Sequence, residues 1–225
     1  MKKIWILLCM LVACTSVKKE HVLLVGISPD FPPFAMKVNG ELAGSDVEMI
    51  KKIGIALNKK VEFKEMDFNA LIPALLARKV DMAVSGISST AERRKKVLFS
   101  KPYYVERNCV LFNKDKNTFE TVNEIEEKKV AATMGTTQQT VVEKHFKNYK
   151  MYNNNFQLLE ELKLGRIDAF VVGEAQCVEF ANKYKNFGFF LLPDQYNAES
   201  SFAIALRKED QVLADEINKV IDHDL

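Results

Sequence analysis

Apolar residues recur along the chain with the spacing of alternating strands and helices. Residues 22–27 are almost continuously apolar, which predicts a buried strand, and residues 46–57 have the apolar spacing of a helix. A strand at 61–64, a helix at 70–78 and an apolar strand at 81–85 follow. Strands that alternate with helices are typical of parallel β-α-β units, so the pattern predicts an α/β fold.

The second half of the chain repeats this pattern. A strand is predicted at 130–133, helices at 137–146 and 157–164, and a strand at 168–172. Five residues recur 87 positions further on: Leu71, Leu75, Val80, Asp81 and Val84 correspond to Leu158, Leu162, Ile167, Asp168 and Val171. We therefore predict two related lobes, each with a mostly parallel sheet flanked by helices.

The repeat also indicates where a ligand would bind. It aligns Ser85-Gly86 with Val172-Gly173, at the carboxyl ends of two predicted strands. Ligands of open α/β sheets bind at that edge, and two such edges that face each other would form a cleft. Two connecting strands would then act as a hinge.

The repeat and the connections between its halves predict a discontinuous first lobe. We expect residues 22–103 and 198–225 to form this lobe and residues 109–191 to form the second lobe. The hinge is expected at residues 104–108 and 192–197.

The N-terminus reads as a targeting segment. Lys2 and Lys3 precede an apolar run at 4–12 that is too short to span a bilayer. The following Leu-Val-Ala-Cys at 11–14 resembles the lipobox of bacterial lipoproteins. This resemblance implies that residues 1–13 are a signal peptide, that Cys14 carries a lipid and that 14–21 form a tether to the membrane. An ordinary secretory signal that happens to contain a cysteine is the alternative; either reading predicts an extracytoplasmic protein.

Composition excludes several other classes of function. The chain has 32 basic and 30 acidic residues, so it lacks the basic field that nucleic-acid binding requires. Removal of residues 1–13 would remove two lysines and lower the formal charge from +2 to zero. Cys109 and Cys177 each lie in an apolar stretch, which favours two buried thiols over a disulfide. These two cysteines and three scattered histidines form no ligand set for zinc, and no metal site is expected.

Three segments in the first half resemble polar amino-acid-binding proteins of ABC importers. They are Met-Asp-Phe-Asn-Ala-Leu-Ile-Pro-Ala-Leu at 66–75, Val-Asp-Met-Ala-Val-Ser-Gly-Ile-Ser-Ser-Thr-Ala-Glu-Arg at 80–93 and Phe-Ser-Lys-Pro-Tyr-Tyr at 99–104. The resemblance implies a two-lobed periplasmic-binding-protein fold with a hinge of two crossing strands. It also implies a monomeric receptor without a cofactor, which binds a free polar amino acid and delivers it to an ABC permease.

The resemblance assigns Arg93 to the α-carboxylate of the ligand. Thr90 is expected to cap a helix whose first turn contains Arg93, and a guanidinium can bind a carboxylate with two parallel hydrogen bonds. The backbone of Ser88 would assist. In the second lobe, Thr136 and Thr137 lie in a Gly-Thr-Thr-Gln turn before a helix, where free N–H groups suit an anionic oxygen.

Aromatic and polar residues are expected to complete the pocket. Phe31 and Phe68 match the family's aromatic residues that cover the aliphatic part of the ligand. The Gly86 carbonyl and the Ser88 hydroxyl match acceptors for the α-ammonium. Side-chain specificity would involve Ser28 and Ser85, whereas Asp30 could equally stabilise its proline-rich turn.

The α-ammonium site departs from the family's pattern. The second-lobe aspartate of the family aligns with Gly173, and Glu174 follows directly. A one-residue bulge would bring Glu174 into the cleft; without it, Glu174 would be an exposed acid at a helix start.

Two other functions are compatible with this fold. One is a ligand sensor that acts through a partner. The other is an enzyme similar to periplasmic cyclohexadienyl dehydratase, for which Glu174 or His145 would be the only acid–base candidates. We expect a binding protein without catalytic residues.

Overall fold

The computed structural model describes residues 22–197 and 201–224. The expected signal peptide, the tether and Cys14 lie outside the described residues. No helix within the described ranges combines the length and apolar character that a membrane span needs. Within the same ranges, His, Cys, Asp and Glu side chains form no group of three or more suited to a metal ion.

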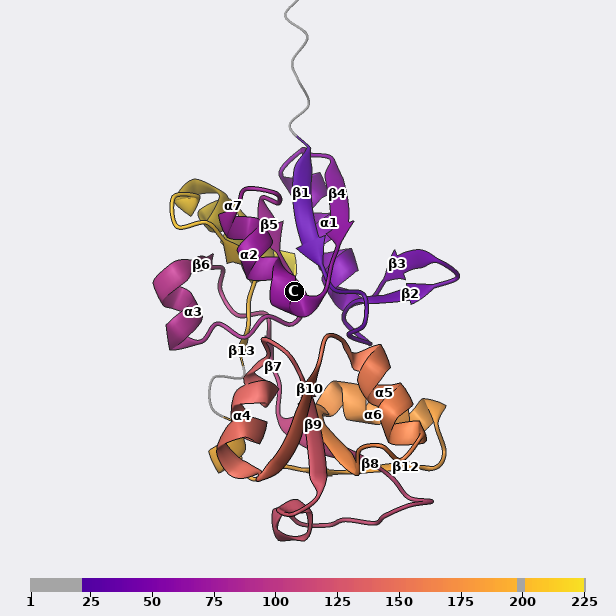
Figure 1. Cartoon of the computed structure of the whole chain (residues 1–225). Helices are drawn as coiled ribbons and strands as arrows, with labels where there is room; N and C mark the ends of the chain where they lie inside the picture. The colour runs from indigo at the N-terminus through magenta and orange to yellow at the C-terminus, as the bar shows by residue number, and fades with distance from the viewer. Residues whose placement is uncertain (1–21, 198–200, 225) are drawn as a thin grey trace, which may run out of the picture.

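The strands form two separate five-stranded sheets, one in each of two lobes that lie one above the other (Figure 1). The sheet of the first lobe is mostly parallel, and its order is β4 (Val61–Glu65), β1 (Leu23–Ile27), β5 (Met82–Ala83), β14 (Ala205–Leu206) and β6 (Leu98–Phe99). The sheet of the second lobe has the order β10 (Asn148–Tyr152), β9 (Lys129–Thr133), β11 (Ala169–Gly173), β8 (Asn108–Asn113) and β12 (Phe187–Leu191).

Helices with an apolar side cover the faces of both sheets. The first lobe contains α1 (Ser45–Ala56), α2 (Leu71–Leu76), α3 (Ala91–Lys96) and α7 (Gln211–Asp224), and the 3₁₀ turn η1 (Phe68–Ala70). The second lobe contains α4 (Thr137–His145), α5 (Asn155–Lys163), α6 (Glu174–Lys183), and the 3₁₀ turns η2 (Val122–Ile125) and η3 (Asp194–Tyr196). A short hairpin, β2 (Met36–Val38) and β3 (Glu41–Ala43), projects from the first lobe (Figure 1).

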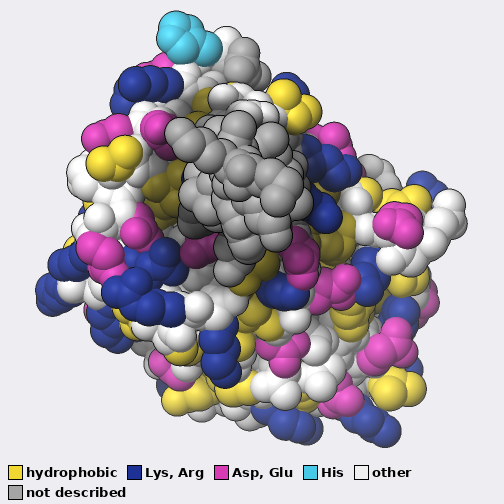
Figure 2. Space-filling model, turned by 90° about the horizontal axis from the view of Figure 1, so that it is seen from above, with side chains coloured by type: hydrophobic (Ala, Val, Ile, Leu, Met, Phe, Trp, Pro, Cys, Tyr) yellow, Lys and Arg dark blue, Asp and Glu magenta, His cyan; other side chains and the backbone are white. Residues whose placement is uncertain are grey.

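Each lobe has an apolar core on both faces of its sheet. In the first lobe, α1 and α7 pack on one face around Ile50 and Ile217, and α2 packs on the other around Leu75. In the second lobe, α5 and α6 pack on one face and α4 on the other. Figure 2 shows Lys, Arg, Asp and Glu side chains intermixed on the surface of the end of the molecule that the first lobe forms.

Two short antiparallel strands connect the lobes. β7 (Tyr104–Val105) pairs with β13 (Ser201–Phe202). The strand that leads from the second lobe back to the first, β13, therefore lies later in the chain than the expected hinge segment 192–197. Leu192 and Tyr196 pack instead against the core of the second lobe.

The two cysteines form a disulfide, which corrects the expectation of separate buried thiols. Cys109 in β8 and Cys177 in α6 are paired, with their Cα atoms 6.6 Å apart. Both lie in the same fully buried apolar cluster. The surroundings of both cysteines are apolar as expected, but the antiparallel placement of β8 beside β11 brings the strand under α6 and the sulfurs together.

Candidate functional site

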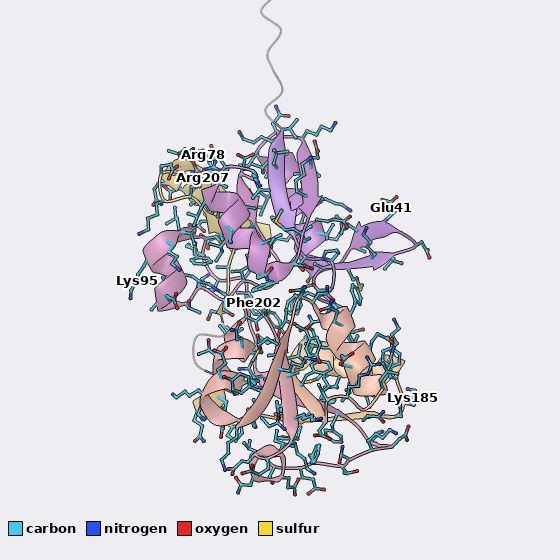
Figure 3. The ribbon with its side chains drawn as sticks, viewed as in Figure 1. Glu41, Arg78, Lys95, Lys185, Phe202 and Arg207 are labelled. Carbon is cyan, nitrogen blue, oxygen red and sulfur yellow. A yellow bond between two sulfur atoms is a disulfide. The ribbon has the colours of Figure 1, made fainter. Side chains whose placement is uncertain are left out.

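A cavity lies between the lobes at the carboxyl ends of the strands. The volume of this space, including the part that is open to solvent, is about 490 Å³. The first lobe contributes Asp30, Phe31, Phe68, Gly86, Ser88 and Arg93, and β13 contributes Phe202; the second lobe contributes Thr133, Thr136, Thr137, Gln138, Asn155, Val171, Val172 and Gln176. Figure 3 shows Phe202 at the junction of the two lobes.

Arg93 extends from the first lobe to the second. Thr90 caps α3, because its hydroxyl accepts a hydrogen bond from the Arg93 N–H at 3.1 Å. The guanidinium donates from Nη1 to the Ser88 carbonyl at 2.8 Å and from Nη2 to the Gly135 carbonyl at 2.7 Å. It also lies 5.5 Å from the centre of the Phe68 ring. These contacts keep the positive charge of Arg93 at the wall of the cavity, between the two lobes.

The turn before α4 brings the second lobe close to Arg93. Thr136 caps the helix by accepting from the Gln139 N–H at 3.2 Å, and its hydroxyl donates to the Thr133 carbonyl at 2.6 Å. Gly135 has a φ of +79°, and a Cβ atom there would lie 3.0 Å from the Cβ of Asn69 in the first lobe. Glycine therefore permits both the turn and the close approach of the lobes.

Phe31 forms an aromatic wall together with residues of its own lobe. Its ring stacks on Phe34 at 5.0 Å between centroids and meets the edge of Phe202 at 5.7 Å. Gly86 has a φ of +57°, and a Cβ atom there would overlap the Phe31 ring. Because Gly86 has no Cβ atom, the Phe31 ring can lie directly over the segment that follows β5.

Asp30 links the lobes through the start of α5. Its Oδ2 accepts from the Asn155 N–H at 2.7 Å, and its carbonyl accepts from the Asn155 side chain at 3.2 Å. Its Oδ1 accepts from the Ser28 hydroxyl at 2.6 Å. Asp30 thus does more than stabilise its turn, since it lines the cavity and binds the other lobe.

Two of the expected specificity residues lie behind the cavity wall. The Ser85 hydroxyl donates to the Ser28 carbonyl at 2.9 Å and accepts from the Ser28 N–H at 3.0 Å. Ser28 directs its own hydroxyl to Asp30. Neither serine is among the residues that line the cavity. Both stabilise the wall instead, which corrects the expectation that they lie in it.

Glu174 is also placed away from the cavity. β11 pairs with β8 in unbroken register as far as Gly173 opposite Asn108, so no bulge precedes α6. The Glu174 carboxylate accepts from the Arg107 Nε at 2.9 Å and Nη2 at 2.8 Å, on the exterior. Of the two alternatives for Glu174, the inward one is therefore contradicted, because the strand ends in regular geometry and Arg107 binds the side chain outside.

The remaining expected residues come together as the motifs indicate. Arg93, Ser88, Gly86, Phe31, Phe68, Thr136 and Thr137 all line the cavity. The residues that sequence reasoning missed lie mainly in the second lobe, notably Asn155 and Gln176. One signal could have found Gln176, since it lies three residues after Gly173 and therefore on the next turn of the helix at the strand end.

Two similar α/β lobes, joined by a pair of strands and enclosing a cavity of polar and aromatic residues at the ends of their sheets, define the class of two-lobed ligand-binding proteins. Within that class, the chain belongs to the bacterial extracellular solute-binding proteins, family 3, whose sequence profile matches residues 23–223. This membership confirms the expected family.

Relatives with curated names cover nearly the whole chain. A probable histidine-binding protein of Campylobacter jejuni is 32% identical over 94% of this chain and 87% of its own. The arginine-binding extracellular protein ArtP of Bacillus subtilis is 30% identical over 88% of this chain and 79% of its own. These relatives are named as binding proteins, which agrees with the expectation of a binding protein rather than an enzyme.

Solved structures confirm the expected fold. The substrate-binding protein of an amino acid ABC transporter superposes with a TM-score of 0.84 at 35% identity, over 90% of this chain and 92% of that one. An ancestral arginine-binding protein bound to arginine gives a TM-score of 0.81 at 32% identity, over 89% of this chain and 91% of that one. The family and its periplasmic members, such as the histidine-binding periplasmic protein of Salmonella typhimurium (29% identical over 97% of this chain and 90% of its own), support the expected extracytoplasmic location.

Proposed function

We propose that the protein is an extracytoplasmic receptor that binds one free polar amino acid between its lobes and presents it to an ABC permease. The observation that carries this proposal is Arg93, which is held at the cavity wall by carbonyl groups of both lobes. A guanidinium in that position suits the α-carboxylate, which every free amino acid has. The relatives named for histidine and arginine binding support the same class of ligand.

Each lobe would contribute to one end of the ligand. Arg93 and the backbone N–H groups at Thr136 and Thr137 would bind the carboxylate, and Phe31 and Phe68 would cover the aliphatic carbons. The Gly86 carbonyl and the Ser88 hydroxyl would accept from the α-ammonium. Because both lobes contact the same small molecule, ligand binding stabilises the closed arrangement over the open one.

A panel of the twenty amino acids tests this function by thermal unfolding. The protein should first be unfolded and refolded without reductant, so that any ligand carried through purification is lost and the Cys109–Cys177 disulfide stays intact. A ligand at 100 times its dissociation constant adds about 2.7 kcal/mol to the free energy of unfolding. We expect at least one polar amino acid to raise the melting temperature by several degrees; a flat response to all twenty would contradict the proposal.

We further propose that the receptor is a monomer anchored to the membrane by a lipid on Cys14. The lipobox-like residues at 11–14 support the anchor. In a bacterium that processes lipoproteins, the full chain should partition into the detergent phase, and the Cys14→Ser variant should partition into the aqueous phase. Equal partitioning of the two would contradict the anchor.

A further inference from the structure

Gln176 is a buried polar side chain at the wall of the cavity. It lies in the first turn of α6, has an exposed fraction of 0% and is one of the cavity-lining residues. Within the described parts of the chain, neither its Oε1 nor its Nε2 has a hydrogen-bond partner. Buried amides nearly always have partners, since they lose their hydrogen bonds to water on burial.

The helix start does not account for this side chain. A glutamine at the third helical position can fold back and accept from the backbone at the N-cap, which completes a capping box. The Gln176 Oε1 accepts no such bond within the described chain, so Gln176 is not used as a cap. Other residues take the first two N–H groups of α6: the Glu174 N–H donates to the Arg107 carbonyl at 2.8 Å, and the Ala175 N–H donates to Glu106 Oε1 at 2.8 Å.

The direction of the side chain places its amide near the end of β11. Side chains on a helix lean toward the helix N-terminus and cover the preceding turn. For Gln176 that turn begins at Gly173, which has no side chain of its own. The space beside Gly173 itself is filled by the Glu106 carboxylate, and Gln176 places a neutral amide on the first turn of α6 next to it, at the wall of the cavity.

The ionisable residues that line the cavity balance each other. Among the described lining residues they are one base, Arg93, and one acid, Asp30. Glu106 and Glu174 lie beside the start of α6 but do not line the cavity. An amino acid with an uncharged side chain brings one positive and one negative charge, so the closed site stays neutral. Arginine or lysine would bring an additional cation, and the described lining residues include no second acid to compensate it, which is unfavourable in a closed cleft.

We infer that Gln176 hydrogen-bonds the ligand and that the cavity selects an amino acid with an uncharged polar side chain over arginine or lysine. Its amide offers one acceptor and two donors, which suits a ligand carboxamide, a hydroxyl or a neutral imidazole. This inference rests on the proposed function, because it assigns the side-chain class of the amino acid that the same cavity binds.

Titration calorimetry with five amino acids tests the inference. Glutamine, asparagine, histidine, arginine and lysine would be titrated at pH 7.5 into the parent protein and into Gln176→Glu, which adds a charge at nearly constant size. We expect the parent to bind one of the first three at least about tenfold more tightly than arginine or lysine. In Gln176→Glu the ratio should shift at least about tenfold toward arginine or lysine.

An exposed glutamine provides the matched control. Gln195 lies in η3 outside the cavity, so Gln195→Glu adds the same charge and should keep the parent's preference. A parent that prefers arginine or lysine, or an unchanged ratio in Gln176→Glu, would overturn the inference and leave the proposed function standing. A parent that binds none of the twenty amino acids would instead refute the proposed function.

A second variant covers the case in which Gln176→Glu does not fold. Gln176→Leu removes both amide atoms at similar size, so the ligand-free protein should melt no lower than the parent, because a buried unpaired amide is replaced by an apolar group. Its affinity for the preferred ligand should fall at least about tenfold. Parent-like affinity in this variant would show that Gln176 does not contact the ligand.

Discussion

Glu106 occupies the space beside Gly173 that a side chain at that position would need. A Cβ atom on Gly173 would overlap the Glu106 carboxylate, whose side chain comes from the connection between the lobes. Glu106 is 3% exposed, and its Oε1 accepts from the Ala175 N–H at 2.8 Å. It therefore stabilises the start of α6, which has no capping side chain at its N-cap residue, Gly173.

Burial of this carboxylate makes folding stability depend on pH. Burial, and to a smaller extent the nearby charge of Glu174, raises the pKa of Glu106 from 4.5 to about 7, although the hydrogen bond from Ala175 lowers it. The folded protein then binds a proton more tightly than the unfolded chain, so Glu106 makes stability fall as the pH rises from about 4.5 to about 7. Burial likewise raises the pKa of Asp46, to about 6, with the same sign.

We predict that Glu106→Gln reduces this loss of stability. Glutamine keeps an acceptor for the Ala175 N–H but has no charge to bury, so the variant should lose less stability than the parent between pH 5 and pH 8. Urea unfolding at both pH values measures the difference, and the exposed Glu41→Gln should behave like the parent. An equal loss in Glu106→Gln and the parent would show that Glu106 does not carry the effect.

The residues of the first lobe could be predicted because they belong to dense motifs. Arg93, Ser88, Gly86 and Phe31 lie in segments whose order and spacing identify the family, and all four line the cavity. Gln176 could not be found in this way, because its placement depends on where β11 ends and α6 begins. The one-residue difference between Gly173 and Glu174 decides which side chains point inward.

At the scale of elements, the repeat in the sequence corresponds to a repeated set of contacts. Asp81 and Leu24 exchange hydrogen bonds, with Leu24 N–H donating to Asp81 Oδ2 at 2.9 Å and Asp81 N–H donating to the Leu24 carbonyl at 2.7 Å. Asp168 and Lys129 exchange the same two bonds in the second lobe, both at 2.9 Å. The aspartate in each lobe thus joins two neighbouring parallel strands at their starts.

The turns before these aspartates match as well. Arg78 and Gly165, which are 87 residues apart, both have a positive φ, of 56° and 69°. Each ends a helix with a left-handed residue before the strand begins. The sequence could reveal this repeat because it depends on local spacing within one helix–turn–strand unit.

Long-range pairing was not accessible in the same way. β8 and β12 run antiparallel to their neighbours in the second sheet, and β-α-β spacing carries no information on them. The Cys109–Cys177 disulfide joins residues separated by 68 positions. Its formation requires the placement of β8 under α6, which apolar surroundings alone do not specify.

At the scale of the molecule, hydrogen bonds join the described parts of the two lobes across the cavity. Besides the bond from Arg93 to Gly135, the Asn155 N–H and side chain donate to Asp30, and the Asn154 side chain donates to Asp67 at 3.4 Å. Separation of the lobes would break these bonds and expose the cavity. Two lobes could be predicted from the sequence, but their close approach depends on details such as the turn at Gly135.

The central claim is that the cleft binds a free amino acid through Arg93. Titration calorimetry of the parent, Arg93→Ala and Arg94→Ala with the amino acid that most stabilises the parent tests this claim most directly. Arg94 is an exposed neighbour on α3, so its variant loses the same charge without touching the cavity. Melting temperatures of the ligand-free proteins verify that all three are folded.

Loss of the charged partner of a carboxylate in a closed cleft typically costs about 2–5 kcal/mol. We therefore predict that Arg93→Ala binds roughly thirty- to several-thousand-fold more weakly than the parent, whereas Arg94→Ala binds with parent affinity. If folded Arg93→Ala binds the amino acid as tightly as the parent, the ligand is not held by Arg93 and the account of this site is wrong.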